Sequence, residues 1–344
     1  MEQKTDKPQP APAAHVEAGQ RSIAANKRGG SVLLAPEDSS SWERRNPTDP
    51  PARAVLGFAE ACVRPGHQSL YESMVTELAE YLGESPATVA AACAAGAESV
   101  AQDWKARQLR KESPPVAVVE FYRTTKSYLF DLTTFNSDYP HTATLEALLK
   151  MAKQRGLTRV LDFGSGIGSV GIFFAQNGLD VSLADISEPL QKYVAWRFKV
   201  RGLKLKLIDL NREQLPRNTF EVVTAFDVLE HLPKPAETLH SLAASMRTGG
   251  LIALNVEEPD ARFPQHIATY EEVFSSVAAA GFRRLQFLQK TEVFERVERG
   301  SIPTLWHAFW GKIWYGALYR NCIAVLDTLG IKRAIRSWIK GPKN

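Results

Sequence analysis

The chain has 344 residues, of which 44% are hydrophobic and 23% charged, and its formal net charge is +4. This composition is typical of globular proteins and excludes a fibrous or wholly disordered chain. The length allows one α/β domain of roughly 150 to 200 residues with helical additions. Three widely spaced cysteines favour neither a disulfide framework nor a zinc site. Because the first thirty residues also lack the apolar stretch of a secretory signal, we expect a cytoplasmic protein.

The positive charge is concentrated at the end of the chain. Residues 301–344 carry seven Lys and Arg against one Asp, a net charge of +6, which leaves about −2 for the rest. Because residues 1–300 carry no excess positive charge, we do not expect a nucleic-acid partner.

Composition and periodicity divide the chain into four segments. Residues 1–51 hold seven of the twenty prolines and no sustained apolar period, which predicts a disordered tail. Residues 52–142 show apolar side chains at helical spacing and predict a helical cap or substrate module. Within this module residues 77–92 resemble a helix-turn-helix, but they present alanines where base-reading side chains would stand, so helix packing is favoured. Residues 143–300 form the catalytic domain, and residues 301–344 a basic helical tail.

Predicted strands and helices alternate through the catalytic domain. This order predicts an α/β fold: a seven-stranded, mostly parallel sheet with helices on both faces and one antiparallel edge strand. The strands are expected at 159–163, 181–184, 203–208, 221–226, 251–256, 283–288 and 292–297, and the helices at 118–134, 143–154, 170–176, 187–201, 236–246 and 270–280.

The strongest local pattern is VLDFGSGIG at residues 160–168, a strand that runs into a glycine-rich turn and a helix. Glycines there permit backbone torsions and close approaches that a side chain would block, and ligands bind at this end of such strands. An acid followed by three alternate glycines resembles class I S-adenosylmethionine-dependent methyltransferases. The resemblance implies a Rossmann-like fold, S-adenosylmethionine as cofactor, and cofactor contacts from Asp162, Gly164, Ser165, Gly166 and Gly168.

Acids also end the second and third predicted strands. By the same resemblance, Asp185 accepts hydrogen bonds from both ribose hydroxyls, with Ile186 beside it. Asp209 faces the adenine amino group, and the backbone amide of Leu210 meets the adenine ring. The alternatives are a helix cap at Asp185 and a surface loop position at Asp209.

A second motif, FDVLEHLPKPAETL, follows the fourth predicted strand. It is similar to a segment of small-molecule methyltransferases of the quinone-biosynthesis type. The resemblance implies that Phe226 and Asp227 border the methionine end of the cofactor. Glu230 and His231 then lie near the acceptor.

The predicted chemistry needs few catalytic groups. A methyl sulfonium is already activated, so the enzyme aligns the acceptor and excludes water, and no metal is predicted. If the acceptor is a hydroxyl, His231 and His266 are the candidate general bases, with structural packing as the alternative. Tyr122 and Tyr128 are candidates to cover the acceptor or cofactor, and ordinary helix packing is their alternative.

The tail combines aromatic and basic residues. Trp306, Trp310 and Trp314 share one helical face, while charged residues interrupt the apolar run before the roughly 18 residues that a spanning helix needs. Peripheral contact with the inner membrane surface and packing on the domain or in a dimer both stay open, as does the oligomeric state. The hypothesis is a small-molecule acceptor that is lipophilic or lipid-linked.

Two other functions compete with methyl transfer. Gly166, Gly168 and Gly171 also fit the dinucleotide pattern G-x-G-x-x-G, which would indicate a nicotinamide-dependent oxidoreductase. Asp162 and Asp209 oppose that interpretation. A non-catalytic methyltransferase-like adaptor is the other alternative, and the intact cofactor motifs oppose it.

Overall fold

The structure, a computed structural model, describes residues 57–138, 141–288 and 291–298. The predicted disordered tail at 1–51 and the predicted amphipathic tail at 301–344 lie outside these residues. None of the described helices is long and apolar enough to cross a membrane.

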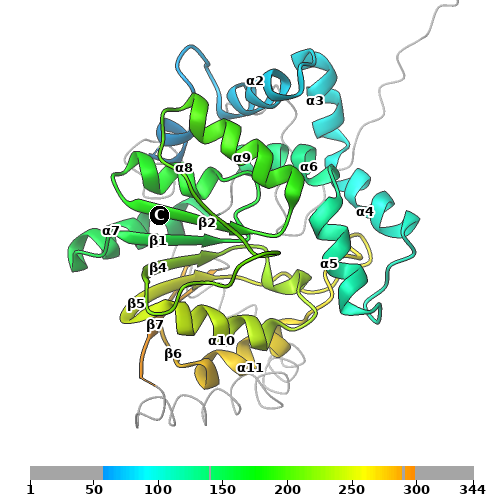
Figure 1. Cartoon of the computed structure of the whole chain (residues 1–344). Coiled ribbons are helices and arrows are strands. Elements are labelled where there is room, and N and C mark those ends of the chain that lie inside the picture. Colours follow the sequence, from blue (N-terminus) through cyan, green and yellow to red (C-terminus); the bar gives the residue numbers. More distant parts are fainter. Residues whose placement is uncertain (1–56, 139–140, 289–290, 299–344) are drawn as a thin grey trace, which may run out of the picture.

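A seven-stranded sheet in the order β3-β2-β1-β4-β5-β7-β6 forms the centre of the molecule (Figure 1). β1 to β5 pair in parallel, whereas β7 is antiparallel to both β5 and β6. The predicted α/β fold with a mostly parallel sheet is confirmed, and the antiparallel strand lies one position in from the edge. The strands are β1 (Arg159–Phe163), β2 (Asp180–Asp185), β3 (Lys206–Asp209), β4 (Phe220–Ala225), β5 (Met246–Leu254), β6 (Phe282–Leu288) and β7 (Thr291–Arg296).

Helices cover both faces of the sheet, as Figure 1 shows. Successive side chains of a strand point to opposite faces, so Val160 joins the core beneath α7 and α8 while Leu161 joins the core beneath α10 and α11. The helices of the catalytic domain are α7 (Thr142–Arg155), α8 (Ser169–Gln176), α9 (Glu188–Val200), the short 3₁₀ helix η1 (Leu229–His231), α10 (Pro235–Ser245) and α11 (Tyr270–Ala280).

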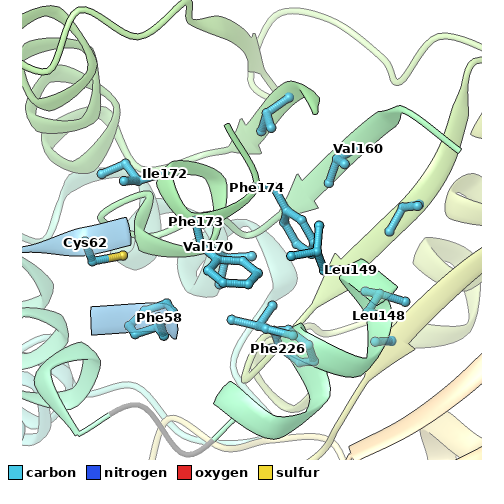
Figure 2. Close-up of a cluster of buried hydrophobic side chains, with 14 of the residues drawn as sticks. Phe58, Cys62, Leu148, Leu149, Val160, Val170, Ile172, Phe173, Phe174 and Phe226 are labelled. Atoms are coloured by element: carbon cyan, nitrogen blue, oxygen red, sulfur yellow. The ribbon is translucent and has the colours of Figure 1, made fainter. Parts of the chain in front are cut away.

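The core beneath α7 and α8 extends to the start of the described chain. Figure 2 shows Phe58 and Cys62 beside Val170 and Phe173 of α8. The rings of Phe58 and Phe173 lie 6.0 Å apart, and both are buried. The chain is therefore packed against the catalytic domain from about residue 57.

Five further helices, here called the cap helices, gather beyond α9 (Figure 1). A third buried cluster joins them to α9, and α2, α5 and α6 contact α9 directly. Gly83 ends α2 in a left-handed conformation, and the Ser85 hydroxyl accepts a hydrogen bond from the amide of Thr88 at the start of α3. The cap helices are α2 (Leu70–Leu82), α3 (Pro86–Ala94), α4 (Gly96–Ala106), α5 (Pro115–Thr124) and α6 (Ser127–Ser137).

The single helix predicted over residues 118–134 is wrong, because the chain breaks at Thr125. This residue is extended, with φ −63° and ψ 138°. Its hydroxyl accepts a hydrogen bond of 3.3 Å from the amide of Ser127, which satisfies a free donor at the start of α6. The break separates Tyr122 on α5 from Tyr128 on α6.

Two strand boundaries also differ from the prediction. β5 begins at Met246 rather than 251 and contains Gly249 at φ 83°, because the strand is irregular where it pairs with β4. β3 begins at Lys206 rather than 203, since the amide of Leu203 caps the end of α9 by donating to the Phe198 carbonyl at 2.9 Å.

Candidate functional site

The glycine-rich loop, residues 164–168, connects β1 to α8. Gly164, Gly166 and Gly168 have φ values of 68°, 53° and 76°, so all three are in the left-handed region that favours glycine. A Cβ at Gly166 would lie 2.8 Å from Leu132 of α6, and one at Gly164 would collide with Val228. The predicted torsions are confirmed, and the close neighbours of these glycines are side chains of the protein itself.

Asp185 ends β2 and supports this loop. Its Oδ2 accepts from the amide of Gly166 at 2.9 Å, and its Oδ1 accepts from the amide of Ser187 at 2.8 Å. Burial raises the pKa of Asp185 in spite of these two donors. The carboxylate therefore lies against the loop, where the sequence predicted it. The alternative, a helix cap, is not what the structure shows, because the N-cap residue of α9 is Ser187 and Asp185 accepts from its amide in the turn before the helix. The ribose contact stays a prediction.

Asp209 ends β3 directly beside Asp185 in the parallel register. Asn211 donates to its Oδ1 from both the backbone amide at 3.1 Å and Nδ2 at 2.8 Å, and Gln191 donates to the same oxygen at 3.2 Å. Partial burial acts to raise the pKa of Asp209, but these hydrogen bonds hold it below its usual value. The amide of Leu210, predicted to meet the adenine ring, donates to the Asp185 carbonyl at 3.1 Å and is already used.

Asp162 lies within β1 and is buried. Thr224 of β4 donates to its Oδ1 at 2.8 Å, and burial raises the pKa of Asp162 to about 7. Nearby in the loop, the buried Ser165 hydroxyl has no hydrogen-bond partner among the described residues. A buried polar atom left without a partner is costly, which fits a position that a ligand completes. Ile186 is half-buried, and its carbonyl accepts from Asn211 Nδ2 at 2.8 Å.

Asp227 follows β4 in the left-handed region, with φ 52°. Asn255 fixes it from the end of β5 by accepting from its amide at 2.9 Å and donating to its Oδ1. His141 Nε2 lies 2.9 Å from its Oδ2, and the His141 ring stacks on Phe226 at 4.7 Å. Burial acts to raise the pKa of Asp227, but His141 beside it lowers the pKa below its ordinary value.

Sequence reasoning missed both partners of Asp227. Asn255 carries a readable signal, because it is a polar residue at the carboxyl end of a predicted strand. His141 has none in its local sequence, since it reaches Asp227 from 86 residues away, in the turn that begins α7, and Thr291 of β7 lies 3.0 Å from its Nδ1.

The predicted acceptor residues meet in one place, here called the acceptor-side cluster: Tyr122, Tyr128, Glu230, His231 and His266. The Tyr122 hydroxyl lies 2.9 Å from His231 Nδ1 and donates to the Gln265 carbonyl at 3.1 Å. The rings of Tyr122 and Tyr128 stack at 5.8 Å, and His266 packs edge-on against His231 at 4.7 Å.

Burial makes the acceptor-side cluster electrically neutral. It lowers the pKa of His231 to about 3, and it also lowers the pKa of His266. Burial and the neighbouring charge of Asp227 raise the pKa of Glu230 well above its usual value. When Tyr122 donates to Gln265, its oxygen is left to accept from His231 Nδ1. In that tautomer His231 Nε2 carries a lone pair.

Three members of this cluster also form a set of metal-ligating atoms. One atom each of Glu230, His231 and His266 lies within 4.8 Å of the other two. Two imidazoles and a carboxylate suit a divalent cation such as Zn²⁺, provided that Glu230 first releases its proton.

A pocket of about 590 Å³ opens beside the cluster. Leu232 and Ile267 form part of its wall and are the chain neighbours of His231 and His266. Lys111, from the connection between α4 and α5, and Pro115, the first residue of α5, line the pocket as well. The volume is in the range of small-molecule sites.

Comparison with known proteins identifies the family. The sequence profile of the family described as "Methyltransferase domain" matches residues 123–308, more than half of the chain. The chain belongs to this methyltransferase family. The assignment makes the protein an enzyme with S-adenosylmethionine as its cofactor, as the sequence predicted, and it weighs against the nicotinamide oxidoreductase.

Individual relatives of the methyltransferase match part of its length. The ubiquinone biosynthesis O-methyltransferase of Bordetella avium is 30% identical over 111 residues, which cover 31% of this chain and 46% of the relative. The corresponding protein of Coxiella burnetii is 26% identical over 149 residues, or 42% of this chain and 64% of the relative. The methyltransferase thus spans about half the length of the curated relatives that it matches.

Solved structures are similar at low sequence identity. The 1,6-didemethyltoxoflavin-N1-methyltransferase of Burkholderia thailandensis is 16% identical, with a TM-score of 0.40 over 54% of this chain and 92% of that chain. An S-adenosylmethionine-dependent methyltransferase of Clostridium acetobutylicum is 11% identical, with a TM-score of 0.40 over 48% of this chain and 95% of that chain.

Proposed function

We propose that the methyltransferase transfers a methyl group from S-adenosylmethionine to the oxygen of a small, lipophilic acceptor. The observation that carries the proposal is the position of two groups of residues. Asp185 at the end of β2 contacts the glycine-rich loop with Asp209 of β3 beside it, and the neutral acceptor-side cluster gathers around Glu230 and His231, which follow β4.

The cofactor assignments follow the strand ends. Asp185 receives the ribose hydroxyls, because each of its oxygens has one backbone donor and a second lone pair. Asp209, kept ionised by its neighbours, receives the adenine amino group. Because the Leu210 amide is already bonded, the adenine contact is assigned to the Asp209 side chain and not to that amide. Phe226 and Asp227 border the methionine end, and the Ser165 hydroxyl supplies a further donor.

The acceptor residues act by orientation and proton transfer. When bound, the cofactor would supply an activated methyl group, toward which Tyr122, Tyr128 and His231 would orient the acceptor oxygen. Tyr122 fixes the ring of His231, so that Nε2 accepts the hydroxyl proton of the acceptor. With a pKa of about 3, His231 is a weak base. Tyr122 and Tyr128 supply the aromatic surface against which a ring packs.

Two features support a lipophilic or lipid-linked acceptor. The relatives in Bordetella avium and Coxiella burnetii are named for ubiquinone biosynthesis. The basic, Trp-rich sequence of residues 301–344 has the composition of a helix that lies on an anionic membrane surface. We place the enzyme in the cytoplasm, with this segment contacting the inner membrane surface.

Two measurements test the proposal. Calorimetric titration with S-adenosylhomocysteine and with NADH should give binding of the first alone. A labelled-methyl assay on polar and lipid extracts should then place the label in the lipid fraction. Binding of NADH instead would refute methyl transfer, and label confined to polar products would refute the lipophilic acceptor.

The membrane contact has its own test. Full-length enzyme should sediment with anionic vesicles, and a variant truncated after residue 300 should stay in solution with unchanged affinity for S-adenosylhomocysteine. Equal sedimentation of the two proteins would rule out the proposed role of the tail.

A further inference from the structure

The backbone of the glycine-rich loop is held by one buried side chain from α9. Arg197 lies on this helix and is fully buried. Its Nη1 donates to the carbonyl of Ile167, between two of the loop glycines, at 2.5 Å, and reaches Ser169 Oγ at 3.3 Å. Hydrogen bonds from a charged donor are the stronger kind, so this contact fixes the orientation of the peptide that follows Ile167.

Arg197 is in turn held by a cap helix. Glu77 of α2 is fully buried, and its Oε2 accepts from Arg197 Nε at 2.9 Å, with Arg197 Nη2 at 2.8 Å. Burial acts to raise the pKa of Glu77, but Arg197 and Arg201 hold it below its usual value. The carboxylate is therefore ionised, and it lies 90 positions before Ile167 in the sequence.

Arg201 completes the network without touching the loop. Its Nε donates to Glu77 Oε1 at 2.8 Å, and its Nη2 donates to the carbonyl of Cys62 at 2.8 Å. Both arginines thus pair with one carboxylate, but only Arg197 contacts the loop itself. Cys62, which Arg201 contacts, donates from its thiol to the carbonyl of Ser169, one residue past the loop, at 3.6 Å. Arg197 leads to the cofactor loop, and Arg201 leads to the segment before α2.

The buried network of Glu77, Arg197 and Arg201 strongly favours one arrangement of its side chains. Taking ionised groups out of water is costly unless each one is paired and hydrogen-bonded, so an alternative arrangement that breaks one contact is strongly disfavoured. The cap helices also pack on the loop directly. The Ile167 side chain is buried in the third cluster, which joins the cap helices to α9, and Leu132 of α6 lies over Gly166.

We infer that Arg197 and Glu77 are positioning residues for the cofactor loop, so that cap helix α2 is a working part of the cofactor site. The inference rests on the proposed use of residues 164–168 to bind S-adenosylmethionine. It assigns the cap a role in cofactor affinity, in addition to the covering role at the acceptor.

The two arginines provide a matched pair of variants. R197M removes the contact with Ile167, and R201M removes only the contacts with Glu77 and Cys62. For each variant we would measure Tm and the Kd for S-adenosylhomocysteine, well below the unfolding temperature. R197M should raise the Kd about tenfold or more, because a hydrogen bond from a charged donor is typically worth at least that factor. R201M should lower Tm but keep the Kd within about twofold of the wild-type value.

A conservative variant separates positioning from stability. R197K retains a positive charge for Glu77, but its three N–H donors sit on one nitrogen and cannot reach both Glu77 and the Ile167 carbonyl as the guanidinium group does. Its Tm should lie above that of R197M while its Kd stays raised. In turnover, KM for S-adenosylmethionine should rise, with kcat at saturating cofactor and KM for the acceptor unchanged. If R197M does not fold, the Kd values of R197K and E77Q for S-adenosylhomocysteine test the inference in its place.

The outcomes distinguish this inference from the proposed function. If the wild-type enzyme binds no S-adenosylhomocysteine, the proposed function fails. If the wild type binds it, and R197K and R197M bind it equally well, the cofactor function stands and the positioning role of Arg197 is overturned. That role is also overturned if R201M raises the Kd as much as R197M.

Discussion

The two halves of the site are built in different ways. At the cofactor half, Asp185 and Asp209 each end a strand, and backbone amides within a few residues or in the adjoining loop donate to them. At the acceptor half, Tyr122, His231 and His266 come from three separate segments and depend on one another. The cofactor half therefore rests mainly on local backbone donors, with Arg197 and Glu77 as one long-range support. Acceptor chemistry instead depends on how the cap meets the catalytic domain.

The largest expected effect comes from D185A, a variant that changes the cofactor half alone. D185A leaves the amides of Gly166 and Ser187 without their acceptor and removes the proposed ribose contact. Because a charge-assisted contact and a stranded donor each cost on the order of 1 to 3 kcal/mol, the Kd for S-adenosylhomocysteine should rise about a hundredfold.

The control for D185A lies on the same strand. Asp180 begins β2 at its far end, is exposed and pairs with Lys206, so D180A should bind S-adenosylhomocysteine like the wild type. D185N, which keeps one acceptor oxygen, should be intermediate. Equal affinity of D185A and D180A would remove Asp185 from the cofactor site.

A smaller effect should appear when the acceptor half is changed. Y122F removes the hydroxyl that contacts His231 and Gln265. Of its two Nδ1 contacts His231 then keeps the longer one, to the Gln265 carbonyl at 3.2 Å, so its ring is held less firmly. We expect kcat to fall about tenfold, which corresponds to one hydrogen bond of ordinary strength, with the Kd for S-adenosylhomocysteine unchanged. Steady-state turnover and calorimetry measure the two quantities separately.

Y128F is the matched variant for Tyr122. Tyr128 stacks on Tyr122 through its ring, and phenylalanine keeps that stack. Its kcat should therefore stay closer to the wild-type value. If both tyrosine variants lost activity equally, or if Y122F weakened cofactor binding, the separation of the two halves would be wrong.

The same difference explains what the sequence could predict. Apolar strands ending in acids, and glycines at alternate positions, are local patterns, so the sheet and the places of Asp162, Asp185 and Asp209 were predictable. Tyr122 and His231 were each named as candidates near the acceptor, but their contact across 109 residues was not predicted. The break at Thr125 depends on a hydroxyl that caps the next helix, which helical periodicity alone does not show.

Long-range partners account for most of what was missed. His141 reaches Asp227 across 86 positions, and Glu77 reaches Arg197 across 120. Each of these residues resembles an ordinary surface residue in its local sequence. Their partners become known only when the packing of α2 on α9, and of the start of α7 on the strand ends, is fixed. These polar pairs can be recognised as buried only once the whole fold is known, because burial depends on how all of the elements pack.

The smallest expected effect sharpens the comparison within the cofactor half, where Asp162 differs from the other acids in being buried inside β1. Its pKa of about 7 lies above the unfolded value of about 3.9, so between these two pH values the folded protein binds more protons than the unfolded one. Stability should therefore fall as pH rises through this window, by roughly 1 kcal/mol between pH 6 and pH 8 for this one group.

The D162N variant tests this pH dependence. Its amide oxygen can still accept from Thr224, but it lacks the titrating carboxyl, so urea unfolding of the cofactor-free wild type and D162N at the two pH values measures the contribution of Asp162. T224V removes a donor that favours the ionised form and should steepen the fall. Identical pH dependence in the wild type and D162N would mean that Asp162 is ionised throughout, as Asp209 at the end of β3 is.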